Sequence, residues 1–148
     1  MSTRAIYTFK DEHGEYHVYK HSDGYPSWAL RFIEAATKNA WPLPRFEADE
    51  FAAAFVAANK EGCGGVRLTA GATWQDTAWA DIQYRYLIQM RGKQLCVDAY
   101  AVSSSFGHRP WTEELLKSGP MDAMLAWSKT DDVANTAPQG LWHGGDER

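Results

Sequence analysis

The sequence has little cysteine and no long apolar run. Its two cysteines, Cys63 and Cys96, are too few and too far apart for a disulfide framework or a zinc knuckle, so we expect reduced thiols. Nowhere do about 18 apolar residues follow one another, as a membrane-spanning helix requires. The N-terminal residues also lack the apolar stretch of a signal peptide. These absences predict a cytoplasmic protein that does not enter a membrane.

The sequence also lacks a strong charge of either sign. Its 15 basic and 19 acidic residues give a net charge of −4, and the pI is about 5.7. A protein that binds the backbone of DNA or RNA needs a dense footprint of Lys and Arg, so we expect no direct binding to that backbone. The negative charge is equally too weak for an acidic surface that imitates DNA.

Aromatic residues, in contrast, are abundant: the chain has 7 Trp, 7 Tyr and 6 Phe. Its 148 residues predict one domain, because a chain of this length can bury roughly two thirds of its unfolded surface in a single core. We expect residues 1–128 to form this domain. From residue 129 onward the composition is polar and small, which predicts a disordered tail over residues 129–148.

Residues 4–21 have the alternating pattern of a β-hairpin around a polar turn. Pairing the charged residues on either side of the turn leaves one apolar and one polar face. On the polar face this register places Thr8 opposite His17 and Arg4 opposite His21.

A second hairpin is predicted over residues 80–102, where two extended runs flank Arg91-Gly92 as a two-residue turn. Pairing Met90 with Lys93 then places Arg85 opposite Asp98 as a cross-strand ion pair. Helical patterns cover residues 27–39, 47–60, 111–117 and 121–127, and a short strand is expected over residues 66–69. This order predicts an α+β fold: an antiparallel sheet of about five strands, built from two hairpins, with the helices packed on one face.

Polar residues gather around the end of the second expected strand. His17 and His21 lie about 13 Å apart along a strand, so they cannot share one metal ion, and we predict no metal site. His21 and Asp23 straddle a turn and could form an acid–base pair, with Arg4 or Arg85 contacting an anion. The alternative is that Asp23 caps the turn or the following helix while His21 is half-exposed.

Two other motifs carry no chemistry. The glycine-rich run at residues 61–65 leads from a helix into a strand, whereas loops that bind phosphate lead from a strand into a helix. Cys63 in that run has no neighbouring histidine, which favours an inert thiol. The serines at residues 103–105 lack the strand–turn–helix context of a nucleophile. We therefore predict no cofactor.

Several tryptophans lie in expected loops or at the ends of elements. Loop tryptophans can stack on a ligand or anchor a partner, and Asp81 could accept hydrogen bonds from a ribose. The alternative is that Trp74, Trp79 and Trp111 close the edge of a small core, and the sequence favours neither. The candidate ligand- or partner-binding residues are Tyr25, Trp74, Trp79, Asp81 and Arg85.

Three segments carry a resemblance to known proteins: S-T-R-A-I-Y at residues 2–7, H-S-D-G-Y-P at 21–26 and D-I-Q-Y-R-Y at 81–86. They resemble a group of small, functionally uncharacterised proteins of phages, prophages and other mobile elements, which carry S-T-R-A-x-Y, H-x-D-G-Y-P and D-x-E-Y-R-Y. The chain departs from that group at Gln83, where the group carries Glu, and at Trp28, where it favours a small residue. The resemblance implies a mobile-element setting and assigns no catalytic residue.

Together these features predict a non-enzymatic binding protein of a phage or mobile element. It would bind a host protein or a small nucleotide-like ligand stoichiometrically, and we expect it to form a homo-oligomer. The alternative is a small enzyme that acts on a nucleotide or phosphate ester, with His21 as general base oriented by Asp23. A purely structural or assembly module is the third interpretation.

Overall fold

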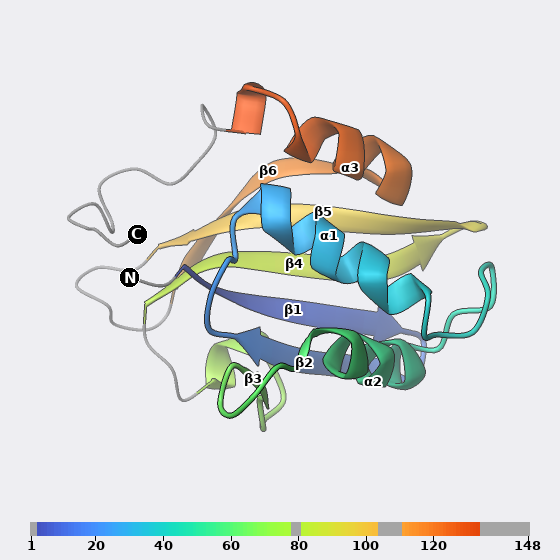
Figure 1. Cartoon of the computed structure of the whole chain (residues 1–148), viewed down its shortest axis with the longest axis horizontal. Coiled ribbons are helices and arrows are strands. Elements are labelled where there is room, and N and C mark those ends of the chain that lie inside the picture. Colours follow the sequence, from blue (N-terminus) through green and yellow to red (C-terminus); the bar gives the residue numbers. More distant parts are fainter. Residues whose placement is uncertain (1–2, 78–80, 104–110, 134–148) are drawn as a thin grey trace.

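A computed structural model describes residues 3–77, 81–103 and 111–133 of the chain. Over these residues the fold is α+β, with six strands in one sheet and three α-helices on one of its faces (Figure 1). In chain order the elements are β1 (Arg4–Asp11), β2 (Gly14–Lys20), α1 (Pro26–Thr37), α2 (Ala48–Asn59), β3 (Val66–Leu68), the 3-10 turn η1 (Trp74–Asp76), β4 (Ile82–Arg91), β5 (Gln94–Ser103), β6 (Thr112–Pro120) and α3 (Met121–Ser128).

The sheet is mixed, where an antiparallel sheet of about five strands was expected. Its strand order is β3-β2-β1-β4-β5-β6, and β1 and β4 run parallel at the centre. A parallel pair needs a long crossover between its strands, and the segment that carries α1 and α2 is part of that connection. Each hairpin is visible in the sequence as a local pattern. The way in which two hairpins join is a contact between distant residues, which local patterns do not specify.

The first hairpin has the predicted register. Thr8 lies opposite His17 and Lys10 lies opposite Glu15. Arg4 Nε also lies 3.4 Å from His21 Nδ1, so the predicted proximity of these two side chains is confirmed.

The second hairpin turns one residue later than predicted. Arg91 lies opposite Gln94, and Gly92 occupies the first position of the two-residue turn with a φ of 62°. Glycine tolerates this positive φ, and the first position is where type II′ turns need it. Because the turn lies one residue later, the residue opposite each position of β4 lies two residues further along β5 than predicted. The core-facing side chains therefore keep their face, but Asp98 lies opposite Leu87 and the predicted pairing of Asp98 with Arg85 is wrong.

The helix predicted over residues 111–117 is also wrong, because this segment forms β6. Its Glu, Leu and Lys residues favour a helix intrinsically, but hydrogen bonding along β5 outweighs that preference. An irregularity in the pairing between Ala99 and Tyr100 leaves Leu116 as an extra residue in β6. The other three predicted helices are present with small shifts at their ends.

The main core lies between the helices and the sheet. On α1 the buried residues include Leu30, Ile33 and Ala36, which form one helical face behind a proline in the first turn. On α2 the buried residues include Phe51 and Phe55, and the ring centroid of Phe55 lies 4.6 Å from that of Tyr7 and 5.3 Å from that of Phe9. This packing orders the sheet and fixes the opposite face.

We call that opposite face the open face, because no α-helix in the described part of the chain lies over it (Figure 1). The turn η1 covers one end of it with a second, smaller cluster. The members of this cluster are Ile6, Tyr19, Trp74, Ile82, Val102 and Trp111. The rest of the open face carries polar side chains from β1, β2, β4, β5 and β6.

Part of the expected tail is described. Val133 packs against the main core after α3, and residues 134–148 lie outside the described residues. None of the helices within the described ranges has both the length and the apolar character needed to cross a membrane.

Candidate functional site

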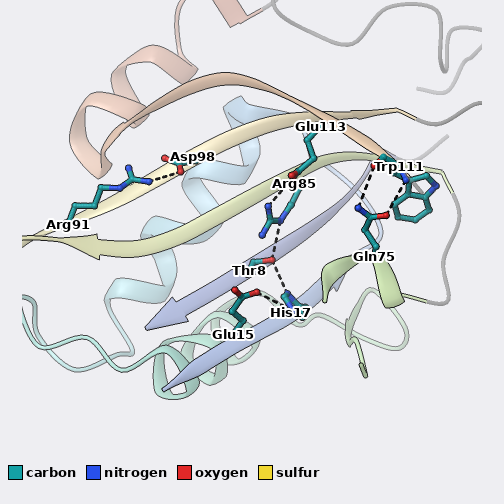
Figure 2. A network of polar contacts seen from close by, with 9 residues as sticks. All are labelled: Thr8, Glu15, His17, Gln75, Arg85, Arg91, Asp98, Trp111 and Glu113. Carbon is teal, nitrogen blue, oxygen red and sulfur yellow. Dashed lines mark hydrogen bonds and ion pairs between the residues drawn. The ribbon is translucent and has the colours of Figure 1, made fainter. Parts of the chain in front are cut away.

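A row of polar side chains crosses the open face (Figure 2). Arg85 on β4 donates from Nη1 to Glu113 Oε2 on β6 at 2.9 Å and from Nε to Thr8 Oγ1 on β1 at 3.4 Å. Thr8 Oγ1 lies 2.9 Å from Nδ1 of His17 on β2. The other ring nitrogen of His17 lies 3.9 Å from Glu15 Oε1. Four strands thus contribute five residues to one row across the open face.

The strand pattern explains why these side chains share a face. Side chains alternate between the two faces of a strand, and the registers of β1, β2 and β4 align the polar positions. Thr8 and His17 lie directly opposite each other, as the sequence predicts. Glu113 joins them because β6 is a strand, so this partner of Arg85 could not be found while residues 111–117 were expected to be helical.

The hydroxyl of Thr8 links Arg85 to His17. The Nε–H of Arg85 can only donate, so Thr8 Oγ1 accepts it, and the same hydroxyl shares a hydrogen bond of 2.9 Å with His17 Nδ1. Burial lowers the pKa of His17, Glu15 opposes this shift, and the positive charge of Arg85 adds to it.

Arg85 is held by aromatic rings as well as by hydrogen bonds. Its guanidinium carbon lies 5.3 Å from the ring centroid of Trp74 and 5.6 Å from that of Tyr100. The structure thus brings together two of the candidate binding residues, Trp74 and Arg85. Both are buried, and the charge of Arg85 is already paired with Glu113.

Trp74 and Trp111 pack against each other inside the small cluster, with ring centroids 5.7 Å apart. Gln75 fixes this arrangement with two hydrogen bonds: its side chain donates to the carbonyl of Trp111 and accepts from its N–H. In this structure the two rings close one end of the sheet. Trp79, the third tryptophan of the group, lies outside the described residues.

Thr8, His17 and Glu15 follow the order nucleophile, base and acid that hydrolases use. Two observations oppose a catalytic role. Thr8 is fully buried, so a substrate has no access to its hydroxyl, and the 3.9 Å between His17 Nε2 and Glu15 is longer than a hydrogen bond. These contacts instead hold Thr8, Arg85 and Nδ1 of His17 in hydrogen bonds on the open face.

The predicted acid–base pair of His21 and Asp23 does not form. No hydrogen bond or ion pair joins these two described residues; Nδ1 of His21 instead lies 2.8 Å from the hydroxyl of Tyr19 and 3.4 Å from Nε of Arg4. Asp23 has a φ of 60° in an exposed turn, and α1 receives no side-chain cap. The sequence spacing placed the two groups near each other, but the left-handed turn between them separates them.

The remaining candidates lie apart from Arg85. Asp81 pairs with Arg4 at 3.4 Å near the edge of the open face. Tyr25 lies on the helix side, where it packs edge-on against Tyr84 with ring centroids 6.5 Å apart. The four described members of the predicted set are therefore divided over two faces of the sheet and do not form one site.

A second ion pair crosses the open face nearer the β4–β5 turn. Arg91 donates to Asp98 at 2.6 Å (Figure 2). Ser118 on β6 donates to the other carboxylate oxygen of Asp98. Within residues 3–77, 81–103 and 111–133, no three His, Cys, Asp or Glu side chains gather in an arrangement that could hold a metal ion. Comparisons with protein-family models, curated proteins and solved structures found no match to the chain.

Proposed function

We propose that this chain is a non-catalytic protein that acts in the cytoplasm by binding a partner protein stoichiometrically through the open face of its sheet. The resemblance of its three sequence segments to proteins of phages and mobile elements supports a host protein as that partner. The proposal concerns the part of the open face between η1 and the β4–β5 turn.

The observation that carries the proposal is the exposure of Leu115. This β6 side chain is 53% exposed and lies beside Tyr100, which is itself half-buried. Around them lie the ion pairs Arg85–Glu113 and Arg91–Asp98. An apolar centre of Leu and Tyr within a charged rim is the usual composition of a protein interface.

The chemistry of the face also favours binding over catalysis. The hydroxyl of Thr8 is buried, and Nδ1 of His21 is engaged by Tyr19 and Arg4. The charge of Arg85 is neutralised by Glu113. These groups are held in fixed positions, and a rigid surface loses little conformational entropy when it binds a partner.

The test compares two exposed leucines at opposite edges of the sheet. Leu115 lies on β6, and Leu68, which is 79% exposed, lies on β3. The full chain and its Leu115→Glu and Leu68→Glu variants are purified from host cells and measured by light scattering and native mass spectrometry. We expect a partner at fixed stoichiometry with wild type and Leu68→Glu, and its loss with Leu115→Glu.

Three results would overturn the proposal. The first is a monomer with nothing bound for all three proteins, and the second is a partner that Leu115→Glu retains. The third is turnover of a nucleotide by the wild type that His21→Ala abolishes, which would replace binding with the enzymatic alternative. A complex that contains only two copies of this chain would identify the partner as a second copy instead of a host protein.

A further inference from the structure

Basic side chains meet at the corner of the open face where β1, β2 and β3 lie together. Arg4 begins β1, His21 follows β2, and Arg67 lies on β3 directly opposite Tyr19. Arg67 donates from Nε to the carbonyl of Gly64, which holds its guanidinium near the strand. The corner is at the opposite edge of the sheet from β6 and Leu115.

The contacts of His21 determine which ring nitrogen a ligand would meet. Arg4 Nε can only donate, and it points to Nδ1 together with the hydroxyl of Tyr19, so Nδ1 must carry a lone pair. The proton of the neutral ring is then on Nε2. Burial, followed by the charges of Arg4 and Arg67, lowers the pKa of His21, which keeps the ring neutral and Nε2–H a donor at neutral pH.

A carboxylate already occupies part of this corner. Asp81 Oδ2 lies 3.4 Å from Arg4 Nη1, and the side chain of Asp81 is 71% exposed. Water screens such an exposed pair, so it contributes little to stability and a competing anion can replace it. The Asp81 carboxylate therefore marks a position at which the guanidinium of Arg4 can bind an oxyanion.

From these observations we infer that the corner formed by Arg4, His21 and Arg67 is a binding site for a phosphate group. Two guanidinium groups and an imidazole N–H supply the donors and the positive charge that a phosphate with several oxygens requires. The phosphate displaces Asp81 from Arg4 and is held between Arg4 and Nε2–H of His21. His21 is a hydrogen-bond donor in this site, and no bond of the ligand is broken.

The experiment titrates the full-length protein with inorganic phosphate and with adenosine 5′-monophosphate, and follows the ring nitrogens of His21 by NMR. We expect a saturable shift with its proton on Nε2. Arg4→Gln should weaken phosphate binding about tenfold, as the loss of a charged hydrogen bond does. Asp81→Asn should strengthen binding, because it removes the competing carboxylate. If the nucleotide binds more tightly than inorganic phosphate, the ligand is a phosphate ester. If the two bind equally, the ligand is free phosphate.

The matched control is Lys38→Gln, which removes one positive charge from the exposed end of α1. It should leave the affinity unchanged. If Arg4→Gln does not fold, Arg67→Gln on the exposed edge strand β3 replaces it, with the same expected weakening. The absence of a saturable shift at His21 would overturn the inference. An equal loss in Lys38→Gln, or an unchanged affinity in Asp81→Asn, would overturn it too. None of these results bears on partner binding at Leu115, which is measured separately.

Discussion

The carboxylate of Asp11 accepts a hydrogen bond from the backbone N–H of Ala48, 37 residues further along the chain, at 2.8 Å. Its other oxygen accepts from the N–H groups of His13 and Gly14 in the β1–β2 turn. The N-cap residue of α2, Glu47, makes no side-chain cap of its own. One side chain thus closes the first hairpin and caps the helix that packs on it, which fixes α2 relative to the sheet.

We predict that Asp11→Ala lowers the free energy of unfolding by about 1–2 kcal/mol, the usual effect of losing a helix cap. The loss leaves N–H groups of the turn and of α2 without their acceptor. Urea denaturation followed by circular dichroism measures the change. Glu12→Gln is the control, because Glu12 is exposed and, among the described residues, forms an ion pair only with His13; it should change stability by less than about 0.5 kcal/mol. Equal effects of the two substitutions would contradict the prediction.

We predict that His17 makes the protein less stable as the pH falls, because its surroundings lower its pKa. Burial holds its pKa in the folded protein below the ordinary value of 6.5, with Arg85 adding to the shift and Glu15 and Asp76 opposing it. As the pH falls below the ordinary value, the unfolded chain takes up a proton before the folded one does. The free energy of unfolding should therefore decrease as the pH is lowered from 6.5 to the pKa that His17 has in the folded protein.

The measurement is the free energy of unfolding as a function of pH for wild type and His17→Gln. The variant should lose part of the slope below the ordinary histidine pKa. His21 also has a lowered pKa, so adding His21→Gln should remove a further part of the slope. A wild-type stability that stays constant through this range, or a His17→Gln slope equal to that of the wild type, would be inconsistent with a buried neutral His17.

Much of this network could be predicted from the sequence, and the limit has a physical cause. Thr8 and His17 were paired correctly because a tight turn fixes their register within a few residues. Glu113 was missed because its segment consists of good helix formers, and its strand conformation depends on pairing with β5. Asp23 was placed beside His21 by spacing alone, whereas its positive φ turns it away. Local patterns therefore predicted the hairpins, and contacts between hairpins and helices could only come from the structure.

The ion pair between Arg85 and Glu113 should be worth more than an exposed pair. The side chains are 10% and 26% exposed, and Arg85 has no other carboxylate within ion-pair distance among the described residues. Glu113→Gln leaves a nearly buried guanidinium without its counter-charge, and we expect a loss of about 1–3 kcal/mol. Glu114→Gln, one residue further along the same strand and exposed, should cost less than about 0.5 kcal/mol. Comparable losses for the two variants would show that the buried pair has no special role.

The core contains three neighbouring tyrosines, Tyr7, Tyr84 and Tyr86. They allow a tyrosine hydroxyl that forms a hydrogen bond to be compared with two that do not. The hydroxyl of Tyr86 donates to the carbonyl of Gly24 at 2.6 Å, whereas those of Tyr7 and Tyr84 are buried and have no hydrogen-bond partner among the described residues. Tyr86→Phe leaves that carbonyl unsatisfied and should cost about 1–2 kcal/mol. Tyr7→Phe removes a buried hydroxyl that forms no hydrogen bond among the described residues, so the free energy of unfolding of this variant should equal or exceed that of the wild type.

The rings themselves are the control, since Tyr7 and Tyr86 stack with centroids 5.2 Å apart and each phenylalanine keeps that contact. Differences in thermal and urea unfolding between the two variants therefore report on the hydroxyl groups alone. Tyr84→Phe should behave like Tyr7→Phe, since its hydroxyl is also without a partner. A loss of stability in Tyr7→Phe as large as that in Tyr86→Phe would mean that the Tyr7 hydroxyl does form a hydrogen bond in solution.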